Sequence, residues 1–168
     1  MPVLKIEQLG AEVLRRRAEE VPGPDAELDR LIDDMFETMY DARGIGLAAP
    51  QVGVSRRVIV VDVNEPDTAG PFALLNPRVV EAGERLEKGE EGCLSIPGVS
   101  AMVERPSTVV VEGLDRAGNP VRIEAVAMLA RCLQHEIDHL DGVLFVDRIS
   151  PLKRKMLLAR WKKQAAAP

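Results

Sequence analysis

Cysteine, histidine and aromatic residues are scarce in this chain of 168 residues, which has two Cys, two His and 3% Phe, Trp and Tyr. The two cysteines, Cys93 and Cys132, are too few for a disulfide framework, so we expect free thiols in a reducing compartment. No apolar run approaches the roughly 18 residues of a membrane-spanning helix. Glu7 and Glu12 interrupt the first residues, which therefore do not resemble a secretory signal. These absences predict a soluble, cytoplasmic protein that does not enter a membrane.

The overall composition is that of an ordinary folded domain. The chain is 46% hydrophobic and 29% charged, and a chain of this length buries enough surface to fold without disulfides. We find no internal repeat, low-complexity segment or linker. We therefore expect residues 1–168 to form one domain.

Charge is distributed unevenly along the chain. The formal net charge is −5, but residues 151–168 contain six Lys or Arg residues and no acidic residue. The acidic remainder argues against a DNA-binding surface. A basic helix is expected at about 151–165, because Pro151 suits a first helical position. Its charges are either a solvated helix face or a docking surface for a polyanion.

Hydrophobic periodicity predicts an α+β fold. Helical spacing predicts a short helix at 11–20, a second helix from an Asp25 cap to about Asp41, and a third that ends before Gly142. The chain between them changes to short β-branched runs, with a hairpin turn at 115–119. The β-branched runs are 58–61, 109–111 and 121–123. We expect the strands in the middle of the chain to be followed by a long helix.

Both histidines belong to one short motif, His135-Glu136-Ile137-Asp138-His139. Residues four apart on a helix lie one above the other, so two imidazoles can point at a single divalent cation. Glu136 lies about 100° around the helix from His135, where it can reach a water molecule on that cation. The motif therefore predicts a catalytic metal site rather than a hydrogen-bonded histidine pair.

A third ligand must come from elsewhere, because a catalytic metal site usually has three protein ligands. Cys132 lies about 10 Å along the helix axis from His139, so it is expected to be a small buried apolar residue. Cys93 is the better candidate, since Gly92 beside it lets the backbone approach closely. Two nitrogens and one sulfur suit zinc and ferrous iron equally.

The glycine-rich segment at 44–49 formally matches the dinucleotide-binding pattern G-x-G-x-x-A. It follows a helix instead of a strand, and Pro50 blocks the helix that should come after it, so we reject dinucleotide binding. Two glycines and two alanines in six residues instead indicate a backbone that a ligand or another chain approaches closely. Gln51 can donate a hydrogen bond to a developing oxyanion.

Three segments, in this order and at this separation, resemble the signature motifs of bacterial peptide deformylase: residues 44–51, 91–95 and 134–139. The likeness extends from Leu14 to Lys153. It implies an α+β fold with antiparallel strands around a central metal-binding helix. It also implies a hydrolase that removes the formyl group from the formyl-methionine of newly made proteins and releases formate. The implied ligands are Cys93, His135 and His139, with ferrous iron native and zinc, nickel or cobalt in purified protein.

The resemblance also assigns roles to single residues. Glu136 is expected to be the general acid and base, and Gln51 with the backbone N–H of Leu94 is expected to form the oxyanion hole. A peptide substrate is expected to pair with Ile45 and Gly46 as an added strand. The residues expected to line the pocket for its methionine are Ile45, Gly92, Met128 and Cys132. A buried pair of Glu91 and Arg105 is expected to hold the Cys93 loop.

Two other functions share part of this pattern. A zinc endopeptidase has the same two histidines and glutamate, but its third ligand is usually a downstream His or Glu, and no His follows His139. A non-catalytic metal-binding homologue would need neither Glu136 nor Gln51.

For the basic C-terminal helix, the resemblance implies a contact with the ribosome. Packing on the body is the alternative, because the helix also has an apolar stripe.

Overall fold

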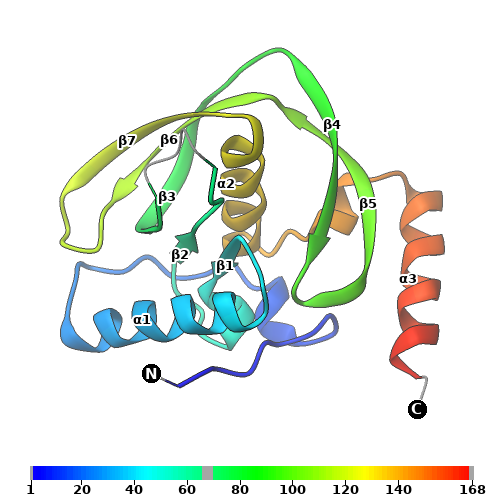
Figure 1. Cartoon of the computed structure of the whole chain (residues 1–168), viewed down its shortest axis with the longest axis horizontal. Helices are drawn as coiled ribbons and strands as arrows, with labels where there is room; N and C mark the ends of the chain where they lie inside the picture. Colours follow the sequence, from blue (N-terminus) through cyan, green and yellow to red (C-terminus); the bar gives the residue numbers. More distant parts are fainter. Residues whose placement is uncertain (1, 66–69, 167–168) are drawn as a thin grey trace.

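In the computed structural model, which describes residues 2–65 and 70–166, one α-helix precedes the antiparallel strands along the chain and two α-helices follow them (Figure 1). The helices are α1 (Ala26–Asp41), α2 (Ala127–Leu140) and α3 (Pro151–Ala165). The strands are β1 (Gly46–Ala48), β2 (Val58–Val61), β3 (Phe72–Ala82), β4 (Leu86–Cys93), β5 (Ile96–Pro106), β6 (Thr108–Leu114) and β7 (Pro120–Val126). Short 3-10 helices occur at Glu12–Arg15, Ala49–Val52 and Phe145–Arg148. The α+β class expected from the sequence is confirmed.

The strands form two sheets. Five strands pair antiparallel in the order β1-β2-β3-β6-β7, and β4 and β5 form a separate two-stranded hairpin. The turn between β6 and β7 is closed by bonds from Asp115 N–H to Asn119 and from Gly118 N–H to Asp115, as the sequence predicted. Strand β1 lies at one edge of the larger sheet, so one of its edges has no strand partner in the described part of the chain.

Helices cover both faces of the larger sheet around β2. Alternate β2 side chains point to opposite faces: Val58 and Val60 pack in a cluster with α1, and Ile59 and Val61 in a cluster with α2. This double burial explains why the strand is an unbroken apolar run. Figure 1 shows α2 in the centre of the molecule, with strands around it and α1 below.

A third cluster joins the β4–β5 hairpin to the C-terminal helix. Leu157 of α3 is buried with Ile96 and Val99 of β5, and Trp161 packs against the same group. The opposite side of α3 exposes Leu152 and Met156. One face of α3 therefore packs on the body, while its other face is open.

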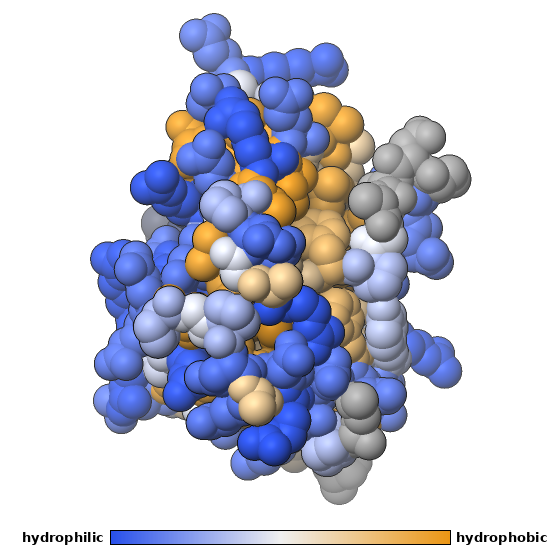
Figure 2. Space-filling model, turned by 90° about the vertical axis from the view of Figure 1, so that its left-hand side faces the viewer, coloured by the Kyte–Doolittle hydropathy of each residue, from blue (hydrophilic) through white to orange (hydrophobic). Residues whose placement is uncertain are grey.

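The surface of the molecule is mainly hydrophilic on the face drawn in Figure 2. Figure 2 shows one face of the molecule, where hydrophilic side chains predominate and apolar surface shows between them, mainly in the upper half. No helix of the described residues has the length and apolar character needed to span a membrane.

The sequence-based boundaries are accurate for α1 and wrong for the first helix. Asp25 caps α1 by accepting a hydrogen bond from Leu28 N–H at 2.8 Å. The helix expected at 11–20 is only the 3-10 turn Glu12–Arg15. The chain beyond it is tied elsewhere, because Ala18 N–H donates to Leu140 and Glu19 bridges to Arg56. These tertiary hydrogen bonds replace the helical ones.

Candidate metal centre and active site

Helix α2 places both histidines on its buried face. His135 and His139 are 9% and 1% exposed, and their Nε2 atoms lie 3.2 Å apart. Burial lowers the pKa of His139 well below its ordinary value. His139 is therefore held as a neutral imidazole, which is the form that binds metals.

Cys93 brings the third ligand atom from the end of β4. Its Sγ lies 3.4 Å from His139 Nε2, and one ligand atom from each of Cys93, His135 and His139 lies within 4.8 Å of the other two. The structure thus brings together the three residues expected from the sequence to hold a metal. Cys132 points elsewhere, since its Sγ lies 3.6 Å from the carbonyl oxygen of Ile45.

The spacing of these donor atoms fits a tetrahedral cation. With bonds of about 2.3 Å to sulfur and about 2.05 Å to nitrogen, tetrahedral geometry places nitrogen atoms about 3.3 Å apart and sulfur about 3.6 Å from nitrogen. The observed separations of 3.2 and 3.4 Å are close to these values. Among the described residues, His139 Nδ1 is a buried atom with no hydrogen-bond partner, so its ring is positioned by the packing around it.

A buried ionic network supports His135 from behind. Glu91 accepts a hydrogen bond from His135 Nδ1 at 2.9 Å and two from Arg105 at 2.6 and 2.9 Å. Burial raises the pKa of Glu91, but the bonds from His135 and Arg105 outweigh burial and lower it to about 2. An ionised Glu91 fixes the His135 proton on Nδ1 and leaves Nε2 free to bind a metal. The expected buried pair of Glu91 and Arg105 is present in the structure.

Glu136 lies beside the histidines in a buried position. It is 4% exposed, and its Oε1 is a buried atom without a hydrogen-bond partner among the described residues. Burial raises the pKa of Glu136 to about 7; the charge of Glu91 adds to this rise, and the charges of His135 and Arg105 oppose it. A carboxyl group with a pKa near neutrality can both take and give a proton.

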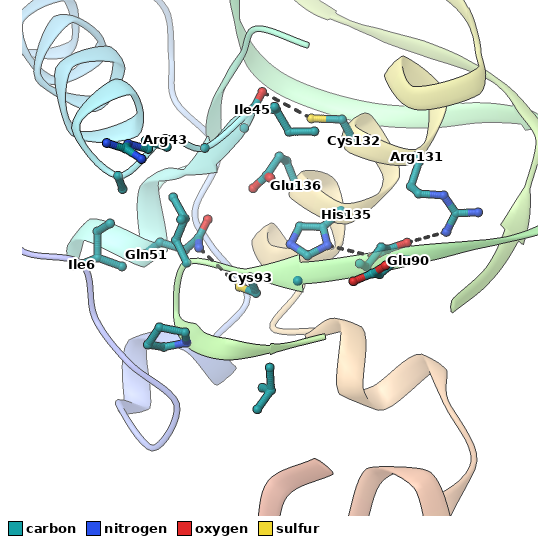
Figure 3. A pocket seen from close by; sticks show the side chains of 18 of the residues that line it. Ile6, Arg43, Ile45, Gln51, Glu90, Cys93, Arg131, Cys132, His135 and Glu136 are labelled. Atoms are coloured by element: carbon teal, nitrogen blue, oxygen red, sulfur yellow. Dashed lines mark hydrogen bonds and ion pairs between the residues drawn. The ribbon is translucent and has the colours of Figure 1, made fainter. Parts of the chain in front are cut away.

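The side-chain amide of Gln51 is fixed at both ends. Its Oε1 accepts from Ala48 N–H at 3.0 Å, and its Nε2 lies 3.2 Å from Ser95 Oγ and 3.6 Å from Cys93 Sγ. Leu94 follows Cys93 in the turn between β4 and β5. Figure 3 shows Gln51, Cys93, His135 and Glu136 gathered around one space.

These side chains open into a cavity of about 610 Å³. It is lined by all the site residues expected from the sequence except His139, which lies deeper: Ile45, Gly46, Gln51, Gly92, Cys93, Leu94, Met128, Cys132, His135 and Glu136. Residues 42–46, at and before β1, and residues 90–94 and 97–99 of the β4–β5 hairpin form further parts of its wall.

The two glycines of the site, Gly46 and Gly92, differ in how closely other atoms approach them. A Cβ on Gly46 would lie 2.6 Å from Glu136 Oε2 and 2.8 Å from Cys132 Sγ, so the close approach predicted for the glycine-rich segment occurs within the fold. The close approach expected at Gly92 is not found, because a Cβ there would have only ordinary contacts, the nearest at 3.5 Å from the Val99 oxygen. The position of Cys93 is therefore set by the turn of the hairpin and not by crowding at Gly92.

Two residues near the site were not anticipated. Ser95 is fully buried and contacts the Gln51 amide, and Asp138 accepts from Arg105 at 2.9 Å and from Arg148 at 2.7 Å. Asp138 lies between the histidines in the sequence, but it points away from them. The available sequence signal for Ser95 was its place two residues after Cys93.

This arrangement defines a class of protein, namely an α+β metallohydrolase with a Cys-His-His centre and an adjacent glutamate. Comparison with known proteins narrows the class. The family model for polypeptide deformylase matches residues 3–155, and the chain belongs to this family.

Curated relatives and solved structures agree with the family model. The chain is 53% identical to a peptide deformylase of Hydrogenovibrio crunogenus over 92% of this chain and 90% of the relative. It is 51% identical to one from Chromohalobacter salexigens over 99% and 98%. A crystal structure of the Legionella pneumophila enzyme has a TM-score of 0.91 at 47% identity, covering 99% of this chain and 100% of that one. The Ehrlichia chaffeensis enzyme, solved in complex with actinonin, has a TM-score of 0.93 at 41% identity, with the same coverage.

The family membership establishes the activity. The protein is a metal-dependent hydrolase that removes the N-formyl group from newly synthesised peptides. It is an enzyme, so the alternatives of a zinc endopeptidase and of a non-catalytic metal-binding homologue are set aside.

Proposed function

We propose that Cys93, His135 and His139 hold one divalent cation, ferrous iron in the native enzyme, with zinc, nickel or cobalt able to replace it. The observation that carries this proposal is the convergence of three donor atoms within 4.8 Å beside a buried, unpaired carboxylate oxygen. When bound, such a cation supplies a Lewis acid, which lowers the pKa of water toward neutrality and polarises a carbonyl oxygen. Helix α2 is then the central metal-binding helix of the fold.

Glu136 transfers the proton in this proposal. Its carboxylate takes a proton from the attacking water and gives it to the amine that leaves, because an amide nitrogen must be protonated to depart. The buried position of Glu136 beside the proposed ligands suits both steps. Gly46 keeps the space beside Glu136 open, since any side chain there would meet the carboxylate.

Gln51 and the backbone N–H of Leu94 stabilise the negative charge that develops on the formyl oxygen. The contacts of Gln51 with Ala48 and Ser95 hold its amide in one orientation before the substrate arrives. A donor that is already oriented stabilises an oxyanion without a reorganisation cost, and removal of one such donor typically slows a reaction about 100- to 1,000-fold.

The peptide binds as an added strand along β1. Strand β1 is an edge strand, so the backbone of Ile45 and Gly46 can pair with a substrate of any sequence. The methionine side chain enters the part of the cavity that Ile45, Gly92, Met128 and Cys132 line. A formyl carbon bears only hydrogen, so a tight site admits it and excludes acetyl groups and internal peptide bonds.

The rest of the chain fits an enzyme that acts on nascent chains in the cytoplasm. We propose that residues 1–168 act as one catalytic domain, of which Met1, 66–69 and 167–168 lie outside the described residues.

The exposed basic face of α3 contacts the ribosome. Because α3 buries Leu157, the suitable test is not deletion of α3 but the double variant Lys155→Glu/Lys162→Glu, which should weaken salt-dependent ribosome binding. Unchanged binding would refute the contact.

The central test is formate release from formyl-Met-Ala-Ser by protein purified without oxygen. The wild type and the control Glu124→Gln, at an exposed position on β7, should release formate and contain one metal ion per chain. Glu136→Gln should keep the metal and lose at least about 100-fold in rate. Cleavage of acetyl-Met-Ala-Ser at a comparable rate would contradict the proposed exclusion, and full activity of Glu136→Gln would contradict the role of Glu136.

A further inference from the structure

Arg131 connects helix α2 to both strands of the β4–β5 hairpin. It lies one helical turn before His135, and its side chain is 12% exposed. Its Nη1 donates to Glu91 Oε2 at 2.7 Å and to the carbonyl oxygen of Val103 in β5 at 2.9 Å. Its Nη2 donates to the carbonyl oxygen of Glu87 in β4 at 2.8 Å. Figure 3 shows the Arg131 side chain directed from α2 toward β4, on the same side as His135.

Gly89 provides the space through which the guanidinium passes. A Cβ on Gly89 would lie 2.6 Å from Arg131 Nε and 2.7 Å from its Cζ. Gly89 is paired with Val103 in the hairpin register, so the guanidinium lies directly against the strand pair. A side chain at residue 89 and the observed Arg131 conformation therefore exclude each other.

The attachment of this hairpin matters because the three proposed ligands lie on two separate elements. Cys93 is at the end of β4, and the two histidines are on α2. The hairpin is not hydrogen-bonded into the five-stranded sheet. A backbone hydrogen bond from Leu9 N–H to Ser95 holds the turn of the hairpin, and side-chain contacts also set its position relative to α2. Small shifts would change the distance between Cys93 and the histidines.

We propose that Arg131 is a positioning residue for the metal centre. Its hydrogen bonds to Glu87 and Val103 hold the hairpin against α2. Its hydrogen bond to the Glu91 carboxylate fixes the orientation of the His135 ring. This inference rests on the proposed Cys93-His135-His139 site.

Charge neutralisation alone does not account for Arg131. Arg105 already donates two hydrogen bonds to Glu91, and a third to Asp138. Glu91 therefore keeps a buried cationic partner when Arg131 is replaced. The contacts that disappear are those with the two strand carbonyls and the second donor to Glu91 Oε2, all of which restrain position.

The test adds cobalt(II) to metal-free protein and follows two absorption signals. The thiolate-to-cobalt charge-transfer band measures binding through Cys93, and the d–d bands report the geometry around the cobalt ion. Arg131→Met should fold with a normal circular dichroism spectrum, bind cobalt about 10- to 100-fold more weakly and show altered d–d bands. Arg131→Lys should be intermediate, because an ammonium group cannot span three acceptors as a planar guanidinium does. The control is Arg122→Met on β7, which loses exposed ion pairs with Glu81 and Glu112 and should match the wild type.

Gly89→Ala tests the same contact without touching the arginine. Its Cβ should displace the guanidinium and reproduce the cobalt-binding loss of Arg131→Met. In zinc-loaded protein, the NMR signal of the His135 Nδ1 proton should shift or exchange faster in both variants and stay unchanged in Arg122→Met.

The possible failures can be told apart. If the wild type binds cobalt without thiolate absorption, both the metal site and this inference are overturned. If the wild type shows that absorption, and Arg131→Met and Gly89→Ala equal Arg122→Met in cobalt affinity and in the His135 signal, the metal site stands and the positioning role of Arg131 is overturned.

Discussion

The Ser95 hydroxyl lies 3.2 Å from Nε2 of Gln51, and both side chains are buried beside the proposed ligand Cys93. Gln51 Oε1 is occupied by the Ala48 N–H at 3.0 Å. The Gln51 amide is thus held from two sides, with an N–H directed toward the Cys93 sulfur and the cavity. Orientation of this amide depends on a residue that makes no proposed contact with the substrate.

Removing the Ser95 hydroxyl should therefore weaken catalysis more than substrate binding. We expect Ser95→Ala to lower kcat by about 10-fold with little change in KM, since the amide loses one of its restraints but keeps its donor. Steady-state kinetics with a formyl-methionyl peptide measure this split. Ser100→Ala, which removes an exposed bond to Glu90, is the control. A change confined to KM would show that Ser95 acts on substrate binding instead.

A side chain at residue 46 should disable Glu136 without disturbing the metal. The Cβ of Gly46→Ala would lie 2.6 Å from Glu136 Oε2, so the carboxylate must move. We expect formate release to fall by about 100-fold or more, which is the usual contribution of a general acid and base. Metal analysis should show normal content. Activity near that of the wild type would mean that Glu136 is not confined as the structure indicates.

Replacing Arg105 should destabilise the protein and loosen the metal. Arg105→Met leaves buried Glu91 and partly buried Asp138 without this partner. Breaking a buried pair typically costs about 3 to 5 kcal/mol, and Arg131 and Arg148 offset part of this cost because they still pair with the two carboxylates. Urea unfolding and metal retention during dialysis against a chelator measure the two effects. Arg78→Met, at an exposed ion pair with Glu112, should change neither. Unaltered stability and metal content would contradict the role assigned to the Glu91–Arg105 pair.

The ionised carboxylate of Asp147 should stabilise the fold at neutral pH, and this contribution should be lost at acidic pH. Burial raises its pKa, but hydrogen bonds from Arg15 and the Leu144 N–H outweigh burial and lower it. A carboxyl group whose pKa is lower in the folded state stabilises the fold above its unfolded pKa, and this contribution disappears as the pH falls through the folded pKa. Asp147→Asn should therefore lower Tm at pH 7 and have less effect near pH 3. An equal loss at both pH values would show that charge is not the cause.

The sequence predicts those parts of this molecule whose residues follow a regular period or a short motif. The apolar spacing from Leu28 to Met39 and the run at Val58–Val61 correspond to α1 and β2, because each buries a periodic face. The histidine pair was placed on α2 for the same reason. The residues alone indicated Gln51 as a donor to an oxyanion, and only the family resemblance paired it with the Leu94 N–H.

Features determined by tertiary contacts could not be predicted in this way. Strand β4 is rich in charged and glycine residues and has one fully buried residue, Glu91, so it lacks the alternation that marks a strand. The path of Arg131 past Gly89 joins residues far apart in the sequence. The 3-10 turn at Glu12–Arg15 replaced an expected helix because neighbouring residues bond to distant segments.

The most direct test of the metal centre is X-ray absorption spectroscopy on the iron-loaded enzyme, purified without oxygen. The proposed site predicts one sulfur neighbour at about 2.3 Å and two imidazole nitrogens at about 2.1 Å, with the sulfur signal lost in Cys93→Ser. A wild-type spectrum without a sulfur neighbour, or one that Cys93→Ser leaves unchanged, would contradict the proposed ligand set.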